Sequence, residues 1–186
     1  MRAATRRLTW LGLALALMLP GVALAQAHGG AGGAQTNDAA RLEDGMRLYR
    51  ADGVDCEWCH GWHGLGRGHD FEYADVQQAG GPALSTSLLD RAAMIELISC
   101  GRIVGERLMV MPQYRGDAWT AGLPCWGKTF ADIPIQERPV HGKRQMNARE
   151  IEAVVDYILA VYRGKRMTLE WCLKYFPASR GICETL

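Results

Sequence analysis

Two thiols and one imidazole occur together in the segment Cys56-Glu57-Trp58-Cys59-His60. Two cysteines at this spacing also occur in thioredoxin-like redox sites and in halves of zinc sites, but neither site requires a histidine directly after the second cysteine. The pattern C-x-x-C-H is typical of covalent haem c attachment, in which the two thiols bind the porphyrin and the histidine reaches the iron. The pattern occurs once in the chain, so we predict one haem c on Cys56 and Cys59 with His60 as an axial ligand.

The N-terminus has the pattern of a secretory signal peptide. Three arginines precede an apolar stretch at residues 8–19, and Ala23-Leu24-Ala25 fits a cleavage site before Gln26. The apolar stretch is shorter than the roughly 20 residues that span a bilayer, which argues against a membrane anchor. Haem c is attached outside the bacterial cytoplasm, so a signal peptide at residues 1–25 is what a protein with the haem-attachment motif requires. We expect a periplasmic protein with no membrane span after cleavage.

The charge balance argues against a nucleic-acid partner. The formal net charge is +1, and it becomes −2 when the three arginines of the signal peptide are removed. Binding to a phosphate backbone depends on an excess of positive charge. After the signal peptide we predict a flexible Gly/Ala-rich leader at residues 26–36, one domain at residues 37–166, and a C-terminal extension at residues 167–186.

Helical patterns predict the elements that position the motif. The first helix begins at Asn37 or Asp38, either of which can cap it, and runs to about Ala51. A second helix is predicted at residues 87–99, with Ser87 and Asp90 as a capping box.

The clearest helical pattern follows Asn147. Glu150 completes a capping box, an apolar stripe continues to Tyr162, and Gly164 stops the helix. The predicted elements are helices, and the predicted fold class is all-α.

These features resemble the class I cytochromes c. In that family an N-terminal helix with a small residue one turn before an aromatic residue leads into the haem motif, and Gly45 and Tyr49 match these positions. Val154 and Tyr157 match the positions at which the family's C-terminal helix crosses the first helix. The resemblance covers roughly residues 38–165. It implies a cytochrome c fold, with crossed N- and C-terminal helices around one haem.

The resemblance also implies which residues surround the iron. In the family a Gly-Pro-x-Leu segment passes behind the proximal histidine, and its proline carbonyl accepts the other ring N–H; Pro82 matches that proline. The family's distal methionine precedes a proline, as Met111 does. Met109 is the alternative ligand, and His141 and Met146 are more distant competitors.

Two other histidines follow the motif closely. His63 is only three residues from His60, on the side of the haem that the attached peptide occupies, so it is badly placed to reach the opposite face. We expect His63 and His69 to be surface residues rather than ligands.

Four cysteines remain, which is an even number in an exported protein. Three pairings are possible. We expect Cys100–Cys125 and Cys172–Cys183, because each joins neighbours in sequence and pins a segment outside the minimal cytochrome. These segments are a long irregular flap (residues 115–146) and the C-terminal extension, where we expect a short helix.

The function that the resemblance implies is single-electron transfer in the periplasm, without enzymatic activity. Ligation by His60 and Met111 fills both axial sites and suits an electron carrier. The extra cysteines and the extension resemble, more loosely, cytochromes that accept electrons from quinoprotein alcohol or methanol dehydrogenases. We therefore expect a periplasmic dehydrogenase as donor and a cytochrome or terminal oxidase as acceptor. Two alternatives stay open: a cytochrome subunit of a dehydrogenase complex, and a haem sensor or enzyme with an open distal site.

Overall fold

The computed structural model describes residues 31–66, 80–102, 111–178 and 180–184 of the chain, with side chains from residue 38 onward. Within these ranges the regular elements are helices and no strand is formed, so the predicted all-α class is confirmed. The predicted signal peptide lies outside the described residues. None of the helices described combines the length and apolar character needed to cross a membrane.

The elements are α1 (Ala31–Tyr49), α2 (Glu57–His60), α3 (Arg91–Cys100), η3 (Phe130–Asp132), η4 (Ile135–Glu137), α4 (Ala148–Tyr157), the π-helix η5 (Ile158–Tyr162), α5 (Leu169–Tyr175) and α6 (Arg180–Cys183).

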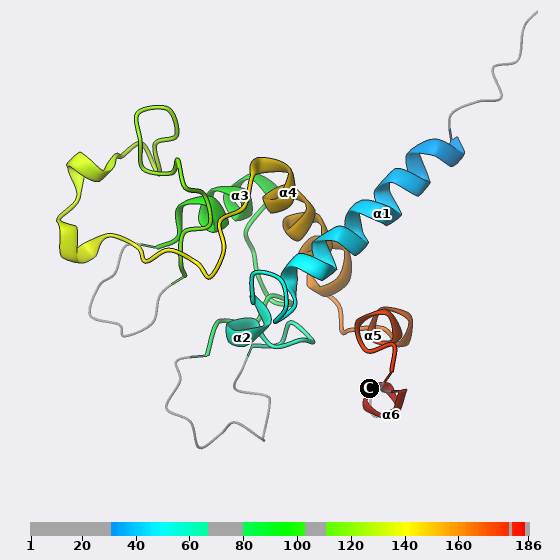
Figure 1. Cartoon of the computed structure of the whole chain (residues 1–186). Coiled ribbons are helices and arrows are strands. Elements are labelled where there is room, and N and C mark those ends of the chain that lie inside the picture. Colours follow the sequence, from blue (N-terminus) through cyan, green and yellow to red (C-terminus); the bar gives the residue numbers. More distant parts are fainter. Residues whose placement is uncertain (1–30, 67–79, 103–110, 179, 185–186) are drawn as a thin grey trace, which may run out of the picture.

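Helix α1 packs directly on α4 (Figure 1). The contact depends on a missing side chain, because a Cβ at Gly45 would lie 2.1 Å from the carbonyl oxygen of Ala153 and 2.7 Å from Cβ of Tyr157. One turn after Gly45, Tyr49 is fully buried, and its ring centroid lies 5.7 Å from that of Tyr157. The predicted contact of the two helices at Gly45 is therefore present.

Two predicted helix starts are wrong. Helix α1 begins at Ala31, within the predicted flexible leader, rather than at Asn37 or Asp38. Two alanines and a glutamine before Asn37 favour helix but Gly32 and Gly33 disfavour it, so local propensity does not account for the early start. Helix α3 begins at Arg91 rather than at Ser87. Asp90 caps it by accepting a hydrogen bond of 2.8 Å from the backbone N–H of Ala93, which leaves Ser87 outside the helix.

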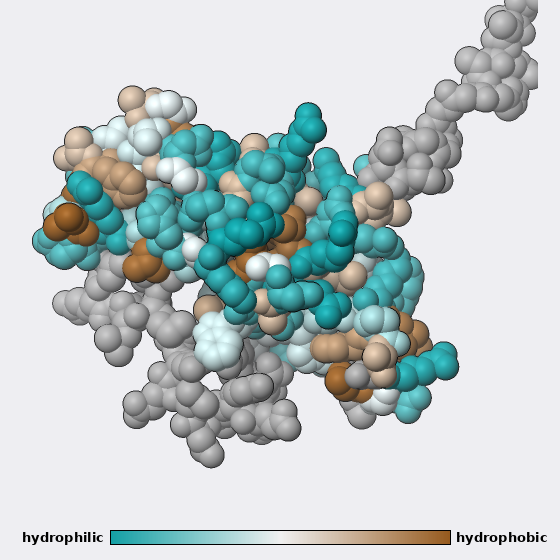
Figure 2. Space-filling model, in the orientation of Figure 1, coloured by the Kyte–Doolittle hydropathy of each residue, from teal (hydrophilic) through white to brown (hydrophobic). Residues whose placement is uncertain are grey.

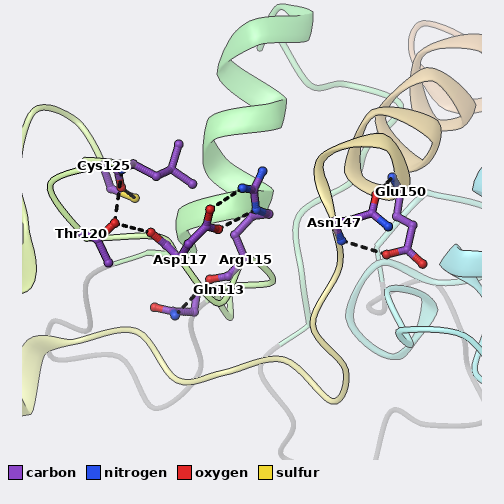
Figure 3. A network of polar contacts seen from close by, with 8 residues as sticks. Gln113, Arg115, Asp117, Thr120, Cys125, Asn147 and Glu150 are labelled. Atoms are coloured by element: carbon purple, nitrogen blue, oxygen red, sulfur yellow. Dashed lines mark hydrogen bonds and ion pairs between the residues drawn. The ribbon is translucent and has the colours of Figure 1, made fainter.

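Helix α4 begins as predicted at the capping box of Asn147 and Glu150 (Figure 3). The side chain of Asn147 accepts from the backbone N–H of Glu150 at 3.0 Å, and the carboxylate of Glu150 accepts from the backbone N–H of Asn147 at 2.8 Å. The helix continues into the π-helix η5 and the chain turns at Gly164, where φ is 68°. A π-helical turn is wider than an α-helical one and is often found at functional sites.

The buried side chains form two separate clusters. The main core contains apolar side chains of α1, α3, α4, η5, α5 and α6, together with Cys56 of the motif and the nearby Val54. The second cluster joins the flap to the last residue of α3 and consists of Cys100, Ala118, Trp119, Cys125 and Ile133. The predicted disulfides Cys100–Cys125 and Cys172–Cys183 are both confirmed.

The flap is an ordered unit held at its start by polar contacts and by a tryptophan. Arg115 pairs with Asp117, and Thr120 donates a hydrogen bond to the carbonyl of Asp117 (Figure 3). The indole N–H of Trp119 donates to the carbonyl of Cys100 at 2.7 Å, next to the disulfide. On the face shown in Figure 2, hydrophobic residues are exposed over the flap and over the C-terminal extension. The exposed large hydrophobic side chains of these two segments include Ile135 and Leu169.

Candidate functional site

Cys59 and His60 of the motif lie on the single-turn helix α2, and Cys56 is the N-cap of this helix. The backbone N–H of His60 donates to the carbonyl of Cys56 at 3.0 Å, and that of Gly61 donates to the carbonyl of Glu57 at 2.8 Å. Cys56 and His60 are buried, and Cys59 is half-buried. Both disulfides use cysteines outside the motif. The three side chains are thus held together at one site.

The ring of His60 is oriented by Pro82. The distance from Nδ1 of His60 to the carbonyl oxygen of Pro82 is 2.8 Å. A carbonyl only accepts, so Nδ1 carries the proton, and in the neutral ring the lone pair is on Nε2, the nitrogen available to a metal. Burial lowers the pKa of His60 below its ordinary value, while the bond to Pro82 acts in the opposite direction. The predicted hydrogen bond between His60 and the carbonyl of Pro82 is present. The role of Pro82 in orienting a metal-binding histidine stays a prediction.

Glycine allows the Pro82 segment to approach the motif. A Cβ at Gly81 would lie 2.8 Å from the carbonyl oxygen of Cys59 and 2.9 Å from Cε1 of His60. The backbone N–H of Gly81 donates to the carbonyl of Cys59 at 2.7 Å. The imidazole of His60 is therefore enclosed by backbone on the side that carries Nδ1.

Burial favours the protonated form of the Cys56 thiol. Its side chain is 6% exposed, and burial, with a smaller effect of Asp55, raises its pKa to about 12. A thiol with this pKa is almost entirely protonated at neutral pH, whereas the thiolate is the nucleophile. Burial therefore disfavours the nucleophilic thiolate of Cys56 in the folded chain.

Two tyrosine hydroxyls hold the loop that follows His60. Tyr49 of α1 donates to the carbonyl of Gly61 at 2.7 Å, and Tyr162 of η5 donates to the carbonyl of Trp62 at 2.6 Å. The hydroxyls of Tyr162 and Tyr157 lie 2.8 Å apart. Helices α1 and α4 thus fix the position of the motif as well as each other.

Two further tyrosines reach the motif from more distant parts of the chain. Tyr175 of α5 donates a hydrogen bond to the carboxylate of Glu57, which lies between the two motif cysteines. Tyr114, directly before the flap, is buried near Cys56 and Cys59, and its hydroxyl lies 3.5 Å from the carbonyl oxygen of Val54. Sequence reasoning missed both contacts, because no local pattern indicates a partner at such separations.

Met111 is half-buried and packs against the main core, which also contains Cys56. Its backbone is fixed by the end of α3: the N–H of Arg102 donates to the Met111 carbonyl at 2.9 Å, and a Cβ at Gly101 would lie 2.8 Å from the same oxygen. Met109 lies outside the described residues. The role of Met111 as distal ligand stays a prediction.

The alternative candidates for an axial ligand of the iron contact other parts of the chain. Met146 is buried in the main core, and Nδ1 of His141 lies 3.2 Å from the side-chain nitrogen of Gln113. Nδ1 of His63 accepts from the backbone N–H of Leu65 at 3.1 Å, within its own loop. His69 lies outside the described residues. In the part of the chain that is described, no group of three or more histidine, cysteine, aspartate or glutamate side chains is arranged to hold a metal ion.

Comparisons of the chain with protein-family models, curated proteins and solved structures found no significant match.

Proposed function

We propose that the chain is a c-type cytochrome with one haem attached to Cys56 and Cys59 and His60 as proximal ligand. The observation that carries this proposal is the hydrogen bond from Nδ1 of His60 to the carbonyl of Pro82, on the same turn as the two thiols. It leaves a neutral, directed Nε2 beside two cysteines at haem-attachment spacing.

The residues around the motif fit such a group. Cys56 lies at the edge of an apolar core, and the partly buried Trp62, Leu84 and Met111 pack against this core. Apolar surroundings suit a porphyrin and keep water from it. The haem supplies one-electron redox chemistry when bound. The chain's own residues fix its position, supply the imidazole in the neutral form, and limit the access of water.

Ligation by Met111 on the distal side completes the proposal. A thioether is a soft, neutral ligand that favours the reduced metal, and filled axial sites leave no position for a substrate. The protein is then a periplasmic single-electron carrier rather than an enzyme, with a fold of the cytochrome c type in which α1 and α4 are the crossed terminal helices. Its donor is a periplasmic dehydrogenase, possible donors being quinoprotein alcohol or methanol dehydrogenases, and its acceptor is a cytochrome or terminal oxidase.

Haem attachment is tested by exporting the full chain from a bacterium that carries a cytochrome c maturation system. The wild-type protein is expected to keep a haem-stained band after denaturing electrophoresis, because the two thioether bonds survive unfolding. The matched control is Cys56→Ala with Cys59→Ala, which removes both attachment points. A wild-type chain that matures without covalent haem would overturn the proposal.

The distal ligand is tested by comparing Met111→Leu with Met94→Leu in the haem-loaded protein. Met94 is buried on α3 and serves as the control for a methionine that only fills the core. Leucine replaces methionine at a cost below about 1.5 kcal/mol, so both variants should fold. We expect Met111→Leu to lose the weak long-wavelength absorption of iron–methionine bonding and to bind carbon monoxide, and Met94→Leu to keep the wild-type spectrum.

The same spectra decide between the alternatives. An unchanged spectrum of Met111→Leu would move the ligand to Met109 or elsewhere. A wild-type protein that lacks the absorption and binds carbon monoxide would instead be a sensor or enzyme with an open distal site. Co-purification with a dehydrogenase would favour the subunit alternative.

A further inference from the structure

Tyr175 connects the C-terminal extension to the inside of the motif. Its side chain is 1% exposed, and its hydroxyl donates to the carboxylate of Glu57. Glu57 is the first residue of α2 and stands between the attachment cysteines. Burial and the neighbouring Glu57 carboxylate raise the pKa of Tyr175, so the hydroxyl keeps its proton and remains a donor.

The same tyrosine is held on its other sides. The guanidinium of Arg50 donates to the Tyr175 carbonyl at 2.6 Å and lies 5.0 Å from the centroid of the Tyr175 ring. The next residue, Phe176, contacts Trp62 edge to face, with 5.0 Å between ring centroids. Residues on both sides of α2 in sequence, Arg50 and Trp62, thus pack against the end of α5.

The extension is itself fixed in shape. The disulfide Cys172–Cys183 joins α5 to α6, and both sulfur-bearing residues are buried in the main core. Lys174 adds exposed ion pairs to Glu43 of α1 and to Glu170. The extension therefore presents Tyr175 from a rigid support.

We propose that Tyr175 is a positioning residue for the haem-attachment turn: it orients Glu57 and thereby holds α2 in the geometry in which Cys56, Cys59 and His60 act together. Helix α2 has four residues, and a single turn is not stable without tertiary contacts. A buried phenol bound to a carboxylate is a strong, charge-assisted contact. The proposal rests on the proposed function, and it assigns a role to the segment that lies beyond the family resemblance.

The first test is amide hydrogen exchange on the haem-free chain, with Tyr175→Phe as the variant. Phenylalanine keeps the ring against Arg50 and Trp62 and removes only the hydroxyl. A hydrogen bond to a charged group has a net contribution that corresponds to roughly tenfold or more in a local opening equilibrium. We expect the amides of His60 and Gly61 to exchange roughly tenfold faster, while the amides of α4 are unchanged.

The control for this test is Lys174→Met, one residue away on the same helix. This variant loses the ion pairs with Glu43 and Glu170 but keeps an unbranched chain over Trp171. We expect it to leave the exchange of the α2 amides at the wild-type rate. Equal exchange in Tyr175→Phe and the wild type would overturn the proposal. Acceleration of every amide would also overturn it, because Tyr175 would then support the whole fold rather than α2.

The second test uses the reduction potential of the haem-loaded protein. In Tyr175→Phe the charge of Glu57 is less compensated, and a negative charge near the metal favours the oxidised state, so the potential is expected to fall. Glu57→Ala removes the charge and is expected to raise it. In the Glu57→Ala background, Tyr175→Phe is expected to cause no further change, because its partner is gone.

The outcomes separate the two proposals. A chain that binds no haem refutes the proposed function, while the exchange experiment on α2 still decides whether Tyr175 orders the turn. The contrary outcome in the haem-loaded protein is that Tyr175→Phe shifts the reduction potential by the same amount in the wild-type and Glu57→Ala backgrounds. This result refutes the role of the Tyr175–Glu57 contact and leaves the cytochrome proposal intact.

Discussion

Burial favours the neutral form of the His60 imidazole in the folded chain. The side chain is 8% exposed, and burial disfavours its charged form, which lowers its pKa in the folded chain. The bond to Pro82 restrains this effect but does not cancel it, because the net direction is downward. A neutral imidazole is also the form that binds metals. Burial therefore stabilises the chemical state that the proposed ligand needs.

The lowered pKa of His60 predicts how the haem-free chain responds to pH. The unfolded pKa is about 6.5 and the folded pKa is lower, so below pH 6.5 the unfolded state binds more protons. The contribution of His60 to stability is therefore fully present above about pH 6.5. It is lost as the pH falls from there toward the folded pKa.

Urea unfolding of the haem-free chain between about pH 5 and pH 8, with His60→Gln as control, measures this effect. We expect the stability of the wild type to fall more steeply on acidification than that of the variant. Parallel curves for the two proteins would show that His60 does not contribute to the pH dependence.

At the level of elements, the approach of α1 to α4 depends on Gly45. The carbonyl of Ala153 occupies the space where any side chain would begin. A backbone atom moves only with its helix, so a clash at this point pushes α1 and α4 apart. Tyr49 of α1 and Tyr162 of η5, the continuation of α4, also hold the loop after His60, so this separation would disturb the motif.

Gly45→Ala is expected to destabilise the protein by about 3 kcal/mol, which is at the upper end for overpacking because the obstacle is backbone. The matched control is Gly181→Ala in α6, where a Cβ would meet nothing within 4 Å. Alanine favours helix over glycine, so this variant is expected to be neutral or up to about 1 kcal/mol more stable. Thermal or urea unfolding compares the two. A Gly45→Ala variant as stable as Gly181→Ala would contradict the close approach.

At the scale of the whole molecule, the two buried clusters suggest two units of different stability. The main core unites the motif with the extension, whereas the flap has its own small core around Trp119. The flap is joined to α3 by the disulfide Cys100–Cys125 and by the bond from Trp119 to the Cys100 carbonyl. The backbone N–H groups of Arg115 and Trp126 also donate to Ser99 and Glu96 of α3, so the covalent link is one of several attachments of this small core.

Replacing both Cys100 and Cys125 by alanine is expected to destabilise the flap by about 3 kcal/mol on the chain-entropy estimate for a disulfide with a sequence separation of 25 residues. Amide exchange should accelerate in the flap, for example at Phe130, whose N–H donates to the Trp119 carbonyl at 2.8 Å. The amides of α4 should keep their protection. Equal loss of protection in the flap and in α4 would show that the molecule unfolds as one unit.

Sequence reasoning was most successful where the deciding interactions are local. The capping box of Asn147 and Glu150 lies within one helical turn, and each disulfide joins cysteines that neighbour each other among the remaining four. It failed at the start of α3, where Ser87 and Asp90 both fit a cap by type. The chain places the helix start at Asp90, and the residue pattern alone did not distinguish the two positions.

The sequence by itself determined the chemistry that this protein can carry, because two thiols and an imidazole within one segment need no fold to be near each other. It also determined the all-α class, through apolar periodicity. Only the tertiary structure decided how the motif is held: phenols from α1, from Tyr114 before the flap, from η5 and from α5 converge on it, across separations of up to 118 residues. Such contacts depend on how whole helices pack, since the position of a hydroxyl is set by every element between it and its partner.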